Sequence, residues 1–427
     1  MQLPLGPLRS RNFALLWSAA LVSNIGSWMQ SVGLGILVTI RTHQPLWTGL
    51  VAAAAFLPVG LVSPVGGVLA DRLDRRRWLI VTTLGETALA GVLAWMAFSK
   101  HDPPSWDVVV AMAGSVFSSL GFPSYQAMLP ELVGKDQLLA AVSLSSAQYN
   151  FGRVIGPALA GLAIAFGSYG FAFLINAISF FAVIIALLMI RLPSSRGDQE
   201  IRAESSEFSE STKTPKMIES IKTGARSAWN LPSARAAIVF IGVVALLGSP
   251  FIALIPAMAI NTLHSGKLGT SMLVTSQGLG AVLGAVFASS FAKAFGRERL
   301  LAFNLAGLPV ALIIYGLMPN LILSCVSLFL VGGLYIGVLS GLNTAIQLSV
   351  PGQTRGRVLS FYMMTLGTLY PLGSLLMGSI ANYTGVRWVT VGGAGILIVS
   401  WVVVGTSITS LLVGLGIVPL AQSASPG

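Results

Sequence analysis

One short stretch of the sequence concentrates charge in a way that could hold two helix ends together. It reads Gly67-x3-Asp71-Arg72-x-Asp74-Arg75-Arg76 and follows a long apolar segment. A carboxylate at a helix end can bind the positive N-terminus of a neighbouring helix, and such a contact is worth about 1–2 kcal/mol when partly buried. Asp71 could make this contact and so bias a gate without locking it. Alternatively, the motif only anchors this end of the segment through its positive charge.

Two other ionisable side chains lie inside apolar segments, where charge is costly and usually functional. Arg153 could bind an anionic or carbonyl-bearing ligand, or hold a neighbouring carboxylate in its charged form. Glu86 could take up and release a proton. A pairing of Glu86 with Arg153 is the alternative, because it would explain both residues structurally.

These residues belong to a chain with the composition of an integral membrane protein. Hydrophobic residues make up 54% of the 427 residues and charged residues only 9%, against about 25% in soluble proteins. A net charge of +11 would suit nucleic-acid binding only if the basic residues shared one face, and instead they lie between apolar segments. The single cysteine, Cys325, can form neither an intrachain disulfide nor a Cys-based metal site, and we predict no metal site.

Apolar stretches long enough to cross a bilayer as helices recur along the chain. They cover residues 13–40, 47–70, 78–98, 106–128, 138–166 and 170–190, and then 234–263, 268–295, 300–318, 321–348, 358–383 and 388–415. We therefore predict an all-α membrane protein with twelve transmembrane helices in two pseudo-symmetric six-helix bundles. The predicted domains are an N-terminal bundle at 1–190, a central loop at 191–232 and a C-terminal bundle at 233–427.

The connections between these segments indicate how the chain crosses the membrane. Most of the 25 Lys and Arg residues fall in one alternate set of connections, which includes the Arg72 motif and the central loop. Basic residues accumulate on the cytoplasmic side, so we expect both termini and the central loop to be cytoplasmic. The second half of that loop, from Met217 to Trp229, fits a helix lying on the membrane surface. A linker helix without a membrane role fits it equally well.

The two groups of six segments repeat weakly in sequence. Gln126-x3-Pro130 precedes a segment with Gly156-Pro157, and Gln347-x3-Pro351 precedes one with Gly367-x3-Pro371. Two parallel repeats with a site between them at the membrane midplane are the design of many secondary transporters.

With the Gly67–Arg76 motif, this layout resembles the major facilitator superfamily (MFS). Asp74, the Pro-Glu-Leu-Val stretch at 130–133 and Arg153-x2-Gly156-Pro157 are similar to a subgroup that exports enterobactin and macrolides. The resemblance implies the MFS fold and a monomer in the bacterial inner membrane. It also implies transport of a small molecule driven by the proton motive force, without a cofactor or a nucleic-acid partner. Asp71 would then contact the start of the eleventh helix, after Arg355 and Arg357.

The fifth segment carries a Gly-Pro pattern formed by Gly152, Gly156, Pro157 and Gly161. Small residues four apart let two helices approach closely, and Pro157 introduces a kink. In the superfamily a similar Gly-Pro-rich fifth helix marks exporters, which favours export here. We expect Gly280-x3-Gly284 of the eighth segment to pack against it, although ordinary small-residue packing would produce the same pattern.

The same resemblance places segments one, four, seven and ten around a central cavity. Candidate substrate-binding residues are Asn24, Trp28, Gln30, Ser115, Phe122, Arg153, Asn343 and Gln347. Amides, hydroxyls and aromatic rings with little charge suit a bulky amphipathic solute. Each polar residue could instead form hydrogen bonds between helices. Pro250 and Pro256 should bend the seventh segment.

We therefore predict a secondary active transporter that exports a small amphipathic molecule, siderophore-like or drug-like, by proton antiport and alternating access. An MFS uptake symporter and a non-transporting sensor or assembly subunit are the alternatives. An enzyme is disfavoured because His43, His101 and His264 are scattered among outer connections. Nothing resembles a nucleotide-binding loop, which argues against an ATP-driven pump.

Overall fold

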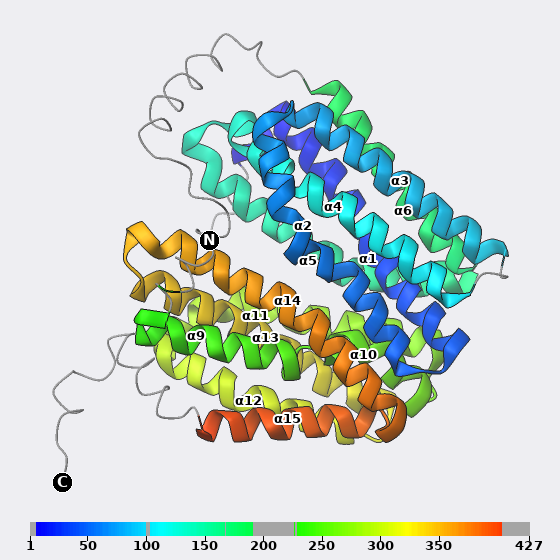
Figure 1. The fold of residues 1–427 in the computed structure, drawn as a ribbon, viewed down its shortest axis with the longest axis vertical. Coiled ribbons are helices and arrows are strands. Elements are labelled where there is room, and N and C mark those ends of the chain that lie inside the picture. The colour runs from blue at the N-terminus through cyan, green and yellow to red at the C-terminus, as the bar shows by residue number, and fades with distance from the viewer. Residues whose placement is uncertain (1–5, 100–102, 167, 191–225, 227–228, 404–427) are drawn as a thin grey trace.

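The computed structural model describes residues 6–99, 103–166, 168–190, 226 and 229–403, and the regular structure in these ranges is helical (Figure 1). In the N-terminal half the helices are α1 (Arg11–Thr42), α2 (Pro45–Arg72), α3 (Arg75–Ser99), α4 (Pro104–Val133), α5 (Leu138–Phe166) and α6 (Tyr169–Met189). Short 3₁₀ turns, η1 and η2, lie at Gly6–Arg9 and Lys135–Gln137.

The C-terminal half begins with an interrupted span made of α9 (Pro232–Val243), η3 (Val244–Gly248), α10 (Phe251–Ala257) and η4 (Met258–Thr262). The helices α11 (Gly266–Phe295), α12 (Arg297–Leu317), α13 (Leu321–Ser349), α14 (Gly352–Thr384) and α15 (Val386–Val403) follow. Both η3 and η4 are π-helical.

The predicted fold class is confirmed. Within the described ranges, ten helical stretches are long and apolar enough to cross a membrane, and α5 and α15 complete the twelve predicted spans. The polar residues in the first half of α5, among them Gln148 and Arg153, explain its lower hydropathy. The predicted surface helix at Met217–Trp229 falls mostly outside the described residues, as does the predicted end of the last span at residue 415.

The seventh span is interrupted beside Pro250, whereas Pro256 lies inside α10, and the bends predicted at both prolines stay predictions. Pro250 lacks an N–H group and lies two residues after the end of the π-helical turn η3. The buried Ser249 stabilises this break, because its Oγ donates to the Val244 carbonyl oxygen at 3.0 Å and lies 3.0 Å from the Tyr335 hydroxyl of α13. The interruption is thereby tied to α13.

Within each half, glycines allow equivalent helix pairs to pack closely. A methyl group on Gly66 of α2 would come within 2.8 Å of the Ser119 carbonyl oxygen of α4. In the other half, a methyl group on Gly284 of α11 would come within 2.8 Å of the Gly333 Cα of α13. Gly280 also faces the α13 backbone. The predicted packing of Gly280 and Gly284 against α5 is therefore wrong, because both glycines face a helix of their own half.

The halves meet along two helix pairs, α2 with α14 and α5 with α11. On α2, Gly49 faces the backbone of Ser374, and a methyl group on Gly60 would lie 3.5 Å from the Gly367 carbonyl carbon. Gly67 lies on the same face of α2, since its spacing of seven residues from Gly60 is nearly two helical turns. A methyl group on Gly67 would nevertheless meet no atom within 4 Å. The two helices therefore separate beyond Gly60.

This separation distinguishes the two ends of the molecule. We call the end that contains the α1–α2 connection at His43–Gln44 the clamped end. The opposite end, which contains the α2–α3 connection at Leu73–Asp74, is the basic end. In Figure 1 the halves lie close together at the right and spread apart toward the left, where α9 and α14 begin.

Candidate functional site

At the clamped end, two asparagines of the C-terminal half hold the α1–α2 connection of the N-terminal half. Asn261 Nδ2 donates to the His43 carbonyl oxygen at 3.2 Å, and the Leu46 N–H donates to Asn382 Oδ1 at 3.1 Å. His43 has a φ of 52° and ends α1 in the left-handed region. Both asparagines bind backbone groups that the end of α1 and the start of α2 leave exposed.

Arg153 of α5 lies half-buried where the halves meet, at the middle of the helix pair α5–α11. Its Nη2 donates to Gln277 Oε1 of α11 at 3.1 Å, and its guanidinium carbon lies 5.8 Å from the centre of the Trp28 ring of α1. The Trp28 ring in turn contacts Tyr149 edge-on, with centroids 5.8 Å apart. The predicted candidates Arg153 and Trp28 therefore lie together, and the structure adds Gln277 and Tyr149.

Gln277 was not predicted, although its environment is the most unusual of this group. It is only 1% exposed, and its Nε2 has no hydrogen-bond partner among the described residues. A buried polar group without a partner costs about 1–3 kcal/mol, so each such group needs an explanation. Gln277 therefore offers an unused donor next to a guanidinium.

Tyrosines from both halves sense the charge of Arg153. Its charge interacts with the phenol groups of Tyr149, Tyr335 and Tyr370. Tyr370 of α14 also contacts Phe56 of α2 edge-on across the halves, with ring centroids 5.2 Å apart. Side chains of α1 and α11 thus contact the Arg153 guanidinium directly.

Glu86 lies apart from Arg153. Its helix α3 packs against α4 and α6, and its side chain interacts with Ser118 of α4. The alternative, a pairing of Glu86 with Arg153, is wrong, because Arg153 instead contacts Gln277 and Trp28. A proton-coupling role for Glu86 stays a prediction.

Three predicted lining residues contact partners inside the N-terminal half. Gln30 Oε1 accepts from Asn176 Nδ2 of α6 at 2.9 Å, and Ser115 Oγ donates to the Ala55 carbonyl oxygen of α2 at 2.5 Å. Asn24 packs against Gly152 of α5. The alternative of interhelical hydrogen bonds therefore fits Gln30 and Ser115, and a substrate contact for any of the three residues stays a prediction.

The other predicted lining residues lie on α4 and α13. Phe122 is 55% exposed. Gln347 Nε2 donates to Asn343 Oδ1 at 2.5 Å, one helical turn away, and Gln347 is exposed near the basic end. A substrate contact for these three residues stays a prediction.

The charged motif divides into exposed and anchored residues. Asp71 and Arg72 are exposed, and Asp71 forms no hydrogen bond or ion pair within the described part of the chain. Asp74 caps α3, because its Oδ1 accepts from the Arg77 N–H at 2.7 Å. Arg75 forms an ion pair with Glu131 at the end of α4. Arg76 Nη2 donates to the Leu188 carbonyl oxygen of α6 at 3.0 Å. Asp74, Arg75 and Arg76 therefore fix the basic ends of α3, α4 and α6 to one another.

The glycines of α5 contact two different helices. A methyl group on Gly156 would come within 2.5 Å of the Trp28 Cβ of α1. A methyl group on Gly161 would come within 2.7 Å of Ser271 Oγ of α11. Pro157 lies between these glycines, inside the helix. The Gly-Pro pattern thus places α5 against α1 in its own half and against α11 in the other half.

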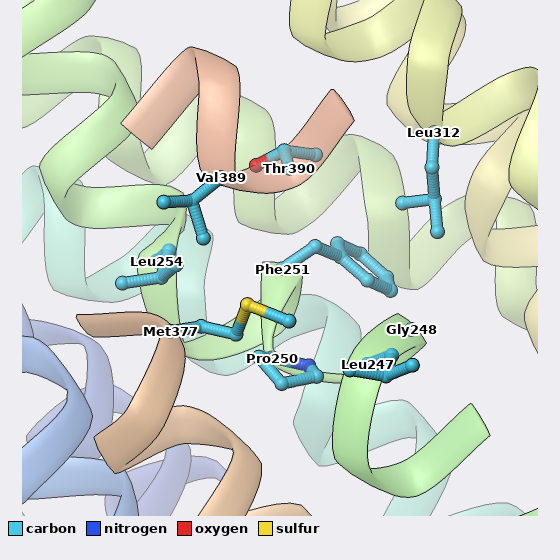
Figure 2. Close-up of a pocket in the computed structure, with 9 residues that line it drawn as sticks. All are labelled: Leu247, Gly248, Pro250, Phe251, Leu254, Leu312, Met377, Val389 and Thr390. Atoms are coloured by element: carbon cyan, nitrogen blue, oxygen red, sulfur yellow. The ribbon is translucent and has the colours of Figure 1, made fainter. Parts of the chain in front are cut away.

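A small cavity lies inside the C-terminal half, beside the break in the seventh span (Figure 2). Its lining is almost entirely apolar, and Pro250, Phe251, Leu312 and Met377 are among the side chains drawn in Figure 2. All its lining residues belong to one half, so it cannot open alternately to two sides. We place no substrate there. Among the described residues, no group of three or more His, Cys, Asp or Glu side chains could hold a metal ion.

Two pseudo-symmetric six-helix halves, with the Arg153 side chain where they meet, define a membrane transporter of the major facilitator superfamily. A family model described as transmembrane secretion effector matches residues 2–411, and the chain belongs to that family.

Relatives and structural neighbours agree with this assignment. The enterobactin exporter EntS of Citrobacter koseri is 26% identical, over 91% of this chain and 89% of its own. Macrolide efflux protein A of Streptococcus pyogenes is 23% identical, over 91% of this chain and 94% of its own. A bacterial homolog of the human lysosomal transporter Spinster, in an inward-facing and occupied conformation, shares the fold with a TM-score of 0.74 at 13% identity, covering 99% of both chains. The predicted resemblance to the enterobactin and macrolide exporters is confirmed.

Proposed function

We propose that this transporter exports a small amphipathic molecule from the bacterial cytoplasm by proton antiport and alternating access. The relatives named above as an exporter and an efflux protein support the direction. The Gly-Pro pattern of α5 supports it independently. We also propose that the chain acts as a monomer in the inner membrane, with domains at 1–190, 191–232 and 233–427.

The observation that carries the proposal is the asymmetry between the two ends. At the clamped end the halves share hydrogen bonds and glycine contacts, whereas on the basic half of α2 the same helix face at Gly67 is open. The basic end, with most of the Lys and Arg residues, is cytoplasmic in this proposal. The structure then represents the inward-facing conformation, ready to take substrate from the cytoplasm.

The opposite conformation requires the basic ends of α2 and α14 to close. Asp71 lies on the α2 face that carries Gly60 and Gly67, and α14 begins at Gly352 without a side-chain cap. Closure would bring the Asp71 carboxylate to the uncapped N–H groups of α14, where the helix dipole favours an anion. We propose that this contact latches the outward-facing conformation. The exposure of Asp71 in the present conformation is consistent with an open latch.

Proton entry would drive the return from the outward-facing to the inward-facing conformation. Each charge that crosses the membrane gains about 2.3 kcal/mol per 100 mV, which exceeds the worth of one latch contact. We propose Glu86 as the proton carrier and Arg153 as the group that senses the substrate, with Trp28, Phe122, Asn343 and Gln347 as further contacts.

Transport in everted membrane vesicles tests this function. The vesicles are energised by respiration, and a pH-sensitive dye reports proton release when a candidate substrate is added. The panel contains a siderophore, a macrolide and a neutral sugar as negative control. Proton release with the siderophore or macrolide, absent from vesicles without the protein, is the expected result.

The alternatives give different results in the same assay. An uptake symporter would move substrate and protons in the same direction, so that the dye response reverses in sign. A sensor or assembly subunit would bind substrate without any dye response to any member of the panel. Either result would refute proton-driven export.

A further inference from the structure

We propose that Arg153, Gln277 and Trp28 form a recognition site for a planar aromatic anion, such as a carboxylate attached to an aromatic ring. The proposal rests on the transport function above and specifies the class of substrate. It starts from the charge of Arg153, which lies at mid-depth between the halves.

No acidic side chain neutralises Arg153 within the described part of the chain. The ion pairs formed there join Arg41 with Asp107 and Arg75 with Glu131, and the hydrogen-bond partner of Arg153 is the neutral Gln277. An arginine at the centre of a membrane helix costs about 2.5–3.5 kcal/mol. A ligand with a negative charge would offset this cost, and a neutral ligand would not.

The hydrogen-bonding groups at this position favour an anion. The Arg153 guanidinium uses Nη2 for Gln277, and its other N–H groups can hold both oxygens of one carboxylate. Gln277 Nε2, buried and without a partner among the described residues, adds another donor. Gln277 Oε1 accepts from Arg153, so the N–H groups of Arg153 that Gln277 does not use, together with Gln277 Nε2, are the donors that face an anion here.

The neighbouring rings favour a planar aromatic group. Trp28 lies within 5.8 Å of the Arg153 guanidinium and within 5.8 Å of the Tyr149 ring. Tyr149 is 45% exposed and lies one helical turn from Arg153 toward the basic end. A ring that entered from that end would meet Tyr149 and Trp28 while its anionic group reached Arg153. Aromatic contacts of this kind add about 0.5–1.5 kcal/mol beyond area burial.

Gln277 also connects recognition to the two halves. Its hydrogen bond joins α5 to α11, and residues on either side of it contact α5, since Gly278 lies against the Arg153 backbone and Ser271 lies against Gly161. A ligand bound to both Arg153 and Gln277 therefore touches both halves. This is the arrangement that a substrate needs to affect their relative position.

Binding of a matched pair of probes to the purified full-length protein tests the proposal. The probes are 2-naphthoate and 2-naphthamide, which share the ring system and differ in charge, and affinities are measured by equilibrium dialysis in detergent. We expect 2-naphthoate to bind at least about tenfold more tightly, because a hydrogen bond to a charged group is stronger than a neutral one. Equal affinity for the two probes would overturn the proposal.

Variants identify the residues responsible. Arg153→Gln should abolish the preference for naphthoate, and Arg153→Lys, which keeps the charge, should retain part of it. Trp28→Ala should lower the affinity for both probes by a similar factor. Arg299→Gln removes the same charge at an exposed position of α12 and should keep the full preference. If the Arg153→Gln protein elutes from a size-exclusion column as the wild type does, and so is folded, but still prefers naphthoate, the proposal is overturned.

The binding measurement does not depend on transport. Charge-selective binding without proton release in vesicles would refute proton-driven export and uphold the recognition site. Proton-coupled export of a neutral compound, with no preference between the two probes, would refute the recognition site and uphold export.

Discussion

A single methyl group on Gly49 should shift the conformational equilibrium of this transporter. Gly49 lies on the face of α2 that meets α14 near the clamped end, and a methyl group there would come within 3.0 Å of the Ser374 carbonyl carbon and closer still to its oxygen. Backbone atoms cannot rotate away as a flexible side chain can, so the two helices would have to move apart. Overpacking of this kind costs about 1–3 kcal/mol.

The cost applies to one conformation only. Gly49 meets Ser374 when the clamped end is closed, and opening of that end removes the clash. Alanine stabilises a helix over glycine by about 1 kcal/mol, but this gain is equal in both conformations and cancels. The population ratio in Gly49→Ala should therefore shift by about 5–150-fold toward the conformation that is open at the clamped end.

Distances between spin labels at the basic end measure this shift. Leu139 of α5 and Phe295 of α11 are 81% and 61% exposed there, and labels are attached to cysteines at both positions in a Cys325→Ser background. The present conformation has these ends apart, so Gly49→Ala should increase the fraction with a short distance between labels.

Two other alanine substitutions serve as matched controls. A methyl group on Gly91 of α3 would meet no atom within 4 Å, and α3 does not belong to either helix pair between the halves, so Gly91→Ala should leave the distribution unchanged. Gly67→Ala is free of clashes here but should hinder closure of the basic end, and so should lower the short-distance fraction. If Gly49→Ala matches the wild-type distribution, the α2–α14 contact does not determine which end is closed.

Further predictions concern the latch, the clamp and the proton. Asp71→Asn should insert normally yet lose most transport in everted vesicles, and wild-type rates at equal expression would refute the latch. Asn261→Ala combined with Asn382→Ala removes two hydrogen bonds worth about 1 kcal/mol each, so the clamped end should open more often. A cysteine introduced at the buried Val38 should then react faster with a membrane-impermeant maleimide added from the periplasm than it does when both asparagines are present. Unchanged labelling would mean that the clamp does not hold this end closed. Glu86→Gln should abolish stimulation of export by a pH gradient while substrate binding persists, and full stimulation in this variant would exclude Glu86 as the proton carrier.

The sequence located the charged members of the candidate site because charge is rare in this chain. Arg153 was recognised as an ionisable group inside an apolar segment, and the structure brings it together with the predicted Trp28. Asp71 was recognised through its motif, and its contact with α14 stays a prediction. The uncharged members escaped notice. Gln277 and Asn261 carry uncharged amide side chains, a residue type that occurs at many positions of this chain. Their partners Arg153 and His43 lie 124 and 218 residues away in the sequence.

The errors have a shared cause. Spacing of small residues shows that a helix can be approached closely, but it does not identify the helix that approaches. Gly280 and Gly284 were therefore assigned to α5, whereas α13 packs on them. Depth in a span likewise says nothing about direction around the helix axis, so Glu86 was paired with Arg153 although its side chain meets α4.

The number and length of the helices, and the duplication that makes two halves, follow from the sequence by itself. Apolar runs must match the thickness of the bilayer and satisfy their own backbone, which is a local condition that each segment meets separately. The tertiary structure alone decided which faces of those helices meet. It placed Arg153 opposite Gln277, set two asparagines on the α1–α2 connection, and left the α2 face at Gly67 without a neighbour and Asp71 exposed at the other end. Those choices depend on the rotation of one helix against another, a relation between distant segments that no single segment contains.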